Sequence, residues 1–350
     1  MKNFFLLALI SILLFSCKNN NHVEEVERSF YFWNCNYQQS DKTESKLKNL
    51  EVAKIYYKIF EVDYSEVRGN FPYEKCRPNS YNSDFINSLN VVPTIFVKNE
   101  IFQYNDEKSL DKLADNIVFL TQKYSTKETY DNKVEILFNY DEIQIDCDWT
   151  KSTKDKYFYL LKKIKELSNK RVSCTLRLYP YKYPDIMGVP PVDKATLMCY
   201  NLIKPLSQQD KNSILDIDEL KKYLDKKRSY PIHLDIALPT FYWTQLYQNN
   251  RFMSLLDLCS KDVVTFAKKV KPMWYQVERD TTINSNYLLA GDMLKTEDIS
   301  GSTIHEAINI IKKQVELDKK ITVSFFDLDS NTFNQYSDEE ISSYYSDFTK

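Results

Sequence analysis

Glycine is scarce in this chain: only four of the 350 residues are glycine, against roughly 7% in an average protein. Phosphate-binding loops of the G-x-G-x-x-G and G-x-x-x-x-G-K-[ST] types need closely spaced glycines, because only glycine lets backbone N–H groups approach a pyrophosphate in so tight a turn. No such pair is present. The sequence therefore excludes a dinucleotide-binding fold, a P-loop and glycine-rich low-complexity structure.

Two further absences narrow the class of protein. The chain has 47 basic and 49 acidic residues and no Lys/Arg run apart from acids, so strong binding to the phosphates of a nucleic acid is not expected. Its seven cysteines form no C-x-x-C pair, which argues against a zinc ribbon or a thioredoxin-like site. We expect neither a metal nor another cofactor. An oxidising compartment would permit disulfides, but the spacing does not assign them.

The first 17 residues read as a targeting segment. Lys2 precedes an apolar run over residues 4–15, which is shorter than a membrane-spanning helix, and the stretch ends in Ser16 and Cys17. The sequence L-F-S-C resembles a bacterial lipobox, which implies a lipid on Cys17 and anchoring in the cell envelope, facing the periplasm or the cell surface. The alternative is ordinary cleavage, which leaves a free cysteine. Residues 18–28 are polar and predict a tether that holds the folded domain off the membrane.

From residue 29 to the C-terminus, apolar β-rich runs alternate with helical periods. Such alternation is typical of β-α units with a parallel sheet. Eight strands are predicted, at 29–35, 52–60, 91–97, 142–149, 172–179, 195–200, 232–238 and 321–328. Helices are predicted at 44–50, 110–124, 152–167, 217–223, 303–317 and 339–348, with a Pro-rich loop at 180–191. Eight units predict an α/β fold, a (β/α)8 TIM barrel over 29–350, with 244–300 inserted between strands 7 and 8. A doubly wound open sheet is the alternative.

Carboxylates and an amide gather at the end of the fourth predicted strand, in the sequence D-E-I-Q-I-D-C-D-W over residues 141–149. Alternate residues of a strand share a face, so Gln144, Asp146 and Asp148 are expected to point together into the barrel. Burying such groups is costly, and two close carboxylates raise one pKa, which suits a general acid. The alternatives are an N-cap for the next helix or a calcium site.

These residues resemble glycoside hydrolase family 18, the chitinase-like barrels, which carry D-x-x-D-x-D-x-E at the end of the fourth strand. Asp146 matches the third Asp, Gln144 replaces the second, and Asp148 stands where the catalytic Glu would be. Downstream, M-C-Y-N ending in Tyr200 and Asn201 resembles the family's M-x-Y-D. The run H-L-D-I-A-L-P-T-F-Y-W over 233–243 resembles its seventh strand. The chain resembles a group of bacterial glycosidase-like barrel lipoproteins more than it resembles true chitinases.

The resemblance implies substrate-assisted hydrolysis, in which an acid protonates the glycosidic oxygen and the acetamido group of the substrate attacks the anomeric carbon. Asp148 would be the acid, Asp146 would orient the acetamido group, and Tyr200 would donate a hydrogen bond to it. Three departures count against efficient catalysis. Asp is shorter than Glu by one methylene, and Gln144 and Asn201 replace ionisable residues. The eighth strand offers Phe325, Phe326 and Asp327 instead of the Trp that usually forms the floor of the sugar site.

Aromatic residues make up 14% of the chain, which either reflects AT-rich codons or includes platforms for sugar rings. Trp33, Trp149 and Trp243 lie near predicted strand ends, and Tyr242 lies in an adjoining loop. These rings are expected to line a cleft, with Gln144, Asn201 and Asp327 as polar partners. The sequence leaves three functions open. The first is a lipid-anchored glycosidase that acts on a glycan. The second is a non-catalytic glycan-binding barrel, and the third is a scaffold for other proteins.

Overall fold

A closed barrel of eight parallel strands forms the centre of the molecule. The computed structural model describes residues 22–35, 41–76, 88–128, 133–328 and 335–350. The barrel strands are β1 (Glu25–Phe32), β2 (Lys54–Ser65), β4 (Asn90–Val97), β7 (Glu142–Asp146), β8 (Arg171–Arg177), β9 (Lys194–Met198), β10 (His233–Pro239) and β18 (Lys320–Phe326). The sheet closes because β1 pairs with both β2 and β18. The predicted (β/α)8 barrel is confirmed, and the open sheet is wrong.

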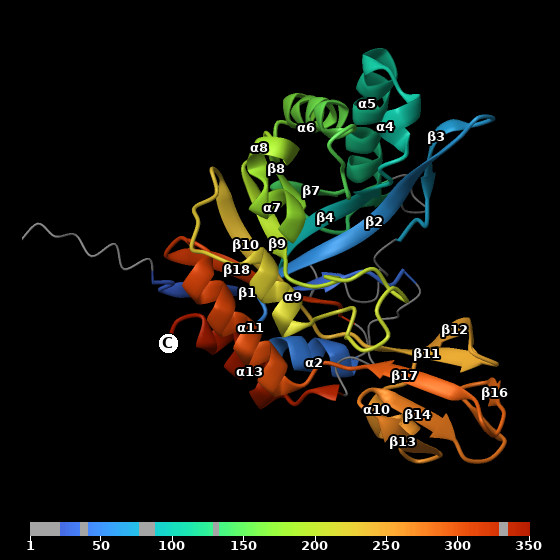
Figure 1. Ribbon diagram of the computed structural model, residues 1–350. Helices are drawn as coiled ribbons and strands as arrows, with labels where there is room; N and C mark the ends of the chain where they lie inside the picture. The colour runs from blue at the N-terminus through green and yellow to red at the C-terminus, as the bar shows by residue number, and fades with distance from the viewer. Residues whose placement is uncertain (1–21, 36–40, 77–87, 129–132, 329–334) are drawn as a thin grey trace, which may run out of the picture.

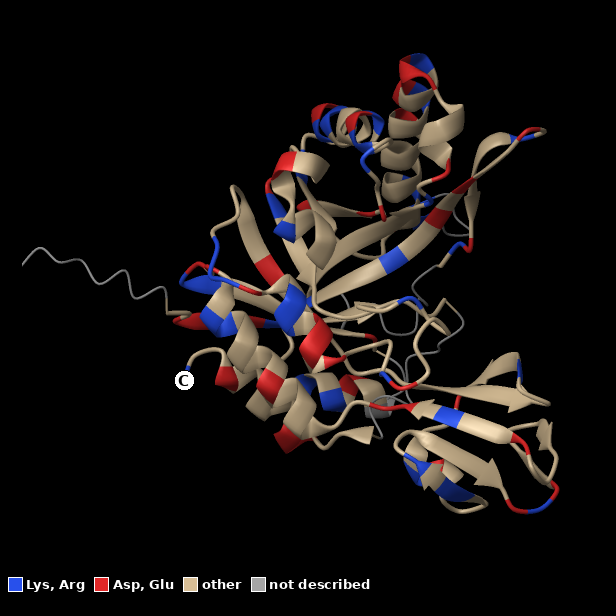
Figure 2. Ribbon diagram, viewed as in Figure 1, with Lys and Arg blue, Asp and Glu red and all other residues tan. Residues whose placement is uncertain are grey.

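The helices pack around the outside of this barrel (Figure 1). Six correspond to predicted helices: α2 (Asp41–Asn49), α5 (Glu107–Tyr124), α6 (Lys154–Ser168), α9 (Ile217–Tyr223), α11 (Gly301–Gln314) and α13 (Asp338–Asp347). Three short ones are added: α4 (Ile101–Tyr104), α7 (Leu178–Lys182) and α8 (Pro184–Met187). A fourth short helix, α10 (Ser260–Val263), lies instead beside the antiparallel sheet that residues 243–297 form. Positive and negative residues are intermixed along these helices (Figure 2).

The Pro-rich segment 180–191, predicted as a loop, contains α8 and the end of α7. Pro184 occupies the first turn of α8, where a missing N–H costs nothing. Gly188 ends this helix with φ +75°, and a Cβ atom there would lie 2.7 Å from the Phe158 ring. Only glycine fits both the backbone angle and this close approach.

The first barrel strand begins at Glu25, inside the segment predicted as a tether. Its acidic residues find basic partners at the amino-terminal end of the barrel: Glu25 pairs with Lys320, and Glu27 pairs with Lys54. Polarity alone therefore misplaced the start of the domain, because β18 supplies the partner of Glu25 and β2 supplies the partner of Glu27.

Residues 243–297 form a five-stranded antiparallel sheet to one side of the barrel (Figure 1). Its order is β12 (Arg251–Leu256), β11 (Trp243–Gln248), β17 (Met293–Glu297), β14 (Trp274–Val277) and β13 (Ala267–Lys271). Small ribbons complete the described structure: β3 (Gly69–Tyr73) extends β2, β5 (Thr126–Glu128) pairs with β6 (Val134–Ile136), and β15 (Thr281–Ile283) pairs with β16 (Asn286–Leu288). One face of the five-stranded sheet has its own apolar core around Leu246 and Leu294.

Candidate functional site

The interior of the barrel is polar at β7, as the alternation of its residues predicts. Gln144 is fully buried; its Oε1 accepts a hydrogen bond from the Tyr31 hydroxyl (2.8 Å), and its Nε2 donates to Thr196 Oγ1 (3.2 Å). Asp146 is 8% exposed, and its Oδ1 accepts from Thr175 Oγ1 at 2.5 Å. Burial, together with the nearby Asp148 carboxylate, raises the pKa of Asp146 to about 7.

Asp148 does not join Gln144 and Asp146 inside the barrel. The strand ends at Asp146, and the Asp148 side chain is 49% exposed. Its Oδ2 accepts a hydrogen bond from Arg177 Nη1 at 2.7 Å, while Arg177 Nη2 donates to the main-chain oxygen of Asn201 at 3.0 Å. Thr153 occupies the N-cap of the following helix, so the alternative of Asp148 as that cap is wrong. The prediction that Gln144, Asp146 and Asp148 point together into the barrel is therefore wrong for Asp148.

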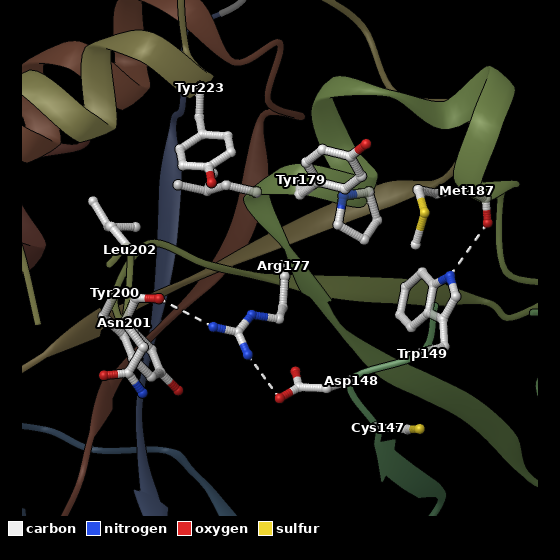
Figure 3. Close-up of a pocket in the computed structure, with 12 residues that line it drawn as sticks. Cys147, Asp148, Trp149, Arg177, Tyr179, Met187, Tyr200, Asn201, Leu202 and Tyr223 are labelled. Atoms are coloured by element: carbon white, nitrogen blue, oxygen red, sulfur yellow. Dashed lines mark hydrogen bonds and ion pairs between the residues drawn. The ribbon is translucent and has the colours of Figure 1, made fainter. Parts of the chain in front are cut away.

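A cavity of about 260 Å³ opens beside this ion pair. Figure 3 shows the Arg177 guanidinium between Asp148 and Asn201. The other lining residues are Cys147, Trp149, Leu178, Tyr179, Pro180, Met187, Tyr200, Leu202 and Tyr223. The Asn201 backbone has φ +53°, and its buried Oδ1 has no hydrogen-bond partner among the described residues. The cavity therefore combines aromatic and apolar walls with one charged pair.

Four partly exposed aromatic rings form a continuous row across the carboxyl end of the barrel: Trp33, Phe326, Phe241 and Trp243. Successive ring centroids along this aromatic row lie 5.5, 5.7 and 5.5 Å apart. The Tyr200 ring stacks on Phe326 at 5.3 Å. Trp33 directly follows β1 and Phe326 ends β18, whereas Phe241 lies two residues after the end of β10 and Trp243 begins β11 of the five-stranded sheet.

The sequence predicted Trp33 and Trp243 as site residues but missed Phe241, and it considered Phe326 only as part of the run over residues 325–327 that replaces the usual Trp. The signal was available, since both phenylalanines stand at the carboxyl ends of barrel strands, where side chains of a (β/α)8 barrel face the site. Tyr242 and Asp327 are partly exposed and adjoin these rings in the chain. A cis peptide bond joins Phe326 to Asp327.

Trp149 and Tyr200 lie deeper than an exposed platform requires. Trp149 is 4% exposed, its ring stacks on Tyr157 at 5.2 Å, and its indole N–H donates to the Met187 oxygen at 3.2 Å. Tyr200 is 3% exposed, and burial raises the pKa of its hydroxyl well above the usual range. The expectation that Trp149 presents a face for stacking is therefore corrected: this ring packs against α6.

Lys58 and a disulfide support the Trp33 end of the row. The Lys58 ammonium lies 5.1 Å from the Trp33 ring and pairs with Glu61 (2.7 Å) and Glu74 (2.8 Å). Cys35 forms a disulfide with Cys76, so the segment after β1 is tied to the segment after β3. Neither partnership was assigned from the sequence. The disulfide joins cysteines 41 residues apart in the chain, and the contact between Lys58 and Trp33 depends on how β1 and β2 pair.

Other expectations fall outside this site or outside the described residues. Cys17 and the targeting segment precede residue 22, where the described chain begins, and no helix in the described part is long and apolar enough to cross a membrane. Within the same part, no group of three or more His, Cys, Asp or Glu side chains is arranged to hold a metal ion.

No protein-family model matches the chain, and no curated protein matches it in sequence. Among solved structures, it is similar to the spore cortex-lytic enzyme SleL of Bacillus megaterium QM B1551, with a TM-score of 0.56 and 13% identity over 95% of this chain and 76% of that one. SleL of Bacillus cereus gives 0.55 and 12%, over 94% and 75%. A chitinase from Bacteroides thetaiotaomicron gives 0.47 and 14%, over 91% and 96%. The two SleL structures show the fold: the chain has the (β/α)8 barrel that its alternating strands and helices predicted.

Proposed function

We propose that this protein binds a glycan at the carboxyl end of its barrel, as a glycosidase-like binding protein. The aromatic row carries the proposal. Four partly exposed rings follow one another at 5.5–5.7 Å, and the flat apolar face of a ring matches the C–H face of a sugar. A row of this length fits an extended oligosaccharide better than a single sugar, because successive rings can contact successive units.

The polar groups beside the row suit recognition of hydroxyl or acetamido groups. Arg177 and Asp148 supply hydrogen-bond donors and acceptors at the wall of the cavity. Sugar-binding sites need such planar polar groups next to apolar faces, because each hydroxyl both donates and accepts hydrogen bonds. The cavity and the row together provide both kinds of surface.

Binding without efficient cleavage is expected because Asp148 is held in an ion pair with Arg177. This residue occupies the position of the acid in the chitinase-like pattern, but its Oδ2 accepts a 2.7 Å hydrogen bond from Arg177. A general acid must deliver a proton from this carboxyl to the glycosidic oxygen, so the ion pair has to break first. Because Asp is shorter than Glu, its carboxyl also lies farther from the glycosidic oxygen, and displacing a catalytic group in this way lowers the reaction rate steeply.

One observation favours hydrolysis as the second candidate. Burial raises the pKa of Asp146 to about 7, so this carboxyl carries a proton on a substantial fraction of molecules at neutral pH. In the substrate-assisted scheme Asp146 would orient the acetamido group and share its proton with Asp148. Turnover would then require both aspartates.

The experiment titrates purified protein with oligosaccharides of β-1,4-linked N-acetylglucosamine, peptidoglycan fragments, xylan and α-glucan by calorimetry, with reducing ends as the assay of cleavage. Phe326→Ala should weaken binding by about 30-fold, since the loss of a central aromatic contact costs at least ~2 kcal/mol. Phe119→Ala is the matched control, because that ring is exposed on α5, away from the barrel mouth. Binding that tolerates Phe326→Ala contradicts the proposal.

Variants of the two aspartates, assayed in the same way, test whether the protein cleaves the glycan. Release of reducing ends that disappears in Asp146→Asn and in Asp148→Asn establishes the hydrolase, whereas binding without release in the unmodified protein establishes the binding function. Both variants keep the shape of the side chain, so a general loss of fold is checked by thermal unfolding.

We propose further that a lipid on Cys17 anchors the barrel to the bacterial cell envelope. The L-F-S-C sequence after an apolar run of 12 residues supports this location. Cells fed an alkyne-labelled fatty acid should label the full-length protein and should not label Cys17→Ser. Equal labelling of the two proteins contradicts lipidation at this residue.

A further inference from the structure

We propose that Glu297 is a positioning residue that holds the Trp243 indole in the glycan site and locks the inserted sheet to the loop after β9. The inference rests on the proposed glycan site for its consequence in binding. Its structural part, the control of Trp243 by Glu297, can be tested without any glycan.

Glu297 uses both carboxylate oxygens and is fully buried. Its Oε2 accepts hydrogen bonds from the Trp243 indole N–H (2.6 Å) and from Ser213 Oγ (2.5 Å). Its Oε1 accepts from Lys295 Nζ at 2.6 Å. The indole is therefore anchored at its nitrogen, and its ring centroid lies 5.5 Å from that of Phe241 in the aromatic row.

Lys295 connects the same carboxylate to the loop that follows β9. The ammonium is 1% exposed and donates to the main-chain oxygens of Gln208 (3.1 Å) and Lys211 (2.7 Å). Trp274 of the same sheet adds a bond to the Gln209 oxygen at 2.9 Å. This loop starts at Asn201 and Leu202, which line the cavity. One buried ion pair thus joins the inserted sheet, the end of the aromatic row and the loop that leads from the cavity.

The face of the sheet on which the ion pair lies separates this role from simple packing. The opposite face of the sheet already has an apolar core of its own, so the ion pair is not needed to fill space. Burying two charges is expensive unless every oxygen and proton has a partner. Here the partners are the groups that must be aligned, namely the Trp243 indole and the loop carbonyls. A side chain fixed before binding loses less entropy when a ligand arrives.

The test compares two double variants of the full chain that both remove the ion pair. Lys295→Met with Glu297→Leu leaves an apolar pair without an acceptor for the indole. Lys295→Met with Glu297→Gln restores an amide oxygen that can accept from Trp243. Replacing a buried ion pair by apolar residues of similar volume often preserves stability, and thermal unfolding checks that both variants fold. Trp243→Phe assigns the Trp243 signal in fluorine NMR of protein labelled with 5-fluorotryptophan.

Relative to the unmodified protein, the Met/Leu variant should shift and broaden the Trp243 resonance. It should also weaken binding of the best glycan about threefold to tenfold, the effect of ordering one more side chain on binding. The Met/Gln variant should keep both properties near those of the unmodified protein. Equal resonances in all three proteins overturn the inference, and equal losses in both variants also overturn it, because the ion pair and not the indole bond would then matter. If no glycan binds the unmodified protein, the proposed function fails, while the resonances still decide the role of Glu297.

Discussion

Asp146→Asn is expected to stabilise the protein at neutral and alkaline pH while leaving its stability near pH 4 almost unchanged. The folded state raises the pKa of this carboxyl from its usual 3.8 to about 7, because the side chain is buried and faces Asp148. Between these two values the folded protein keeps a proton that the unfolded chain releases. Stability therefore falls as the pH rises through this window.

The magnitude follows from the difference between the two pKa values. A difference of about three corresponds to about 4 kcal/mol in the free energy of unfolding, at ~1.4 kcal/mol for each pKa unit. Most of this loss is present by pH 8, and about 2–3 kcal/mol of it develops between pH 5 and pH 8. Asn cannot ionise, and its Oδ1 can still accept the hydrogen bond from Thr175, so the variant avoids this loss.

The assay is urea unfolding at pH 4, 5, 6, 7 and 8, followed by circular dichroism, for the unmodified protein and the variant. Asp141→Asn is the matched control, since this aspartate lies just before the same strand and its side chain is 86% exposed. The difference in unfolding free energy between Asp146→Asn and the unmodified protein should grow with pH, whereas the control difference should stay flat. A difference for Asp146→Asn that is constant within about 0.5 kcal/mol refutes the reasoning.

Three further predictions concern the amino-terminal end of the barrel and the disulfide. Asp235→Asn removes one buried partner of the largely buried Lys194 and should lower the unfolding free energy in urea by about 3–5 kcal/mol; a loss below about 1 kcal/mol contradicts this. Hydrogen bonding to Asp235 raises the pKa of His233, so its stabilising effect is full below pH 6.5 and disappears as the pH rises through the folded pKa. His233→Gln should therefore lower the melting temperature more at pH 5.5 than at pH 9, and equal losses would count against the pair. The double change Cys35→Ser with Cys76→Ser should cost about 2–4 kcal/mol without reductant, and dithiothreitol should abolish the difference between variant and unmodified protein.

The eight barrel strands could be predicted because each is a run of apolar or β-branched residues bounded by polar segments, and such runs depend on neighbours in the chain. The helix over 152–167 could be predicted for the same reason, since Tyr157, Leu160, Leu161 and Ile164 share one face. The start of β1 could not, because Glu25 and Glu27 look like tether residues until β18 and β2 provide lysines. Long-range partners of charged residues leave no local signal.

The candidate site divides in the same way. The motif around Asp146 and Asp148 could be found in the sequence, because strand alternation and spacing are local properties. The Asp148–Arg177 ion pair could not, since Arg177 stands at the end of another strand and its reach depends on how β7 and β8 pair. That contact changes the interpretation of the motif, because it engages the carboxylate that the sequence assigned as the acid.

By itself, the sequence determined the fold class, the strand that carries the carboxylates and the exclusion of glycine-based phosphate loops, because these follow from periodicity and composition. Only the tertiary structure decided which aromatic rings meet. The barrel brings Trp33 from the first strand beside Phe326 from the last, almost 300 residues apart, and Glu297 orients Trp243 through a buried contact. Closure of the sheet creates these neighbours, and no local pattern in the chain encodes closure.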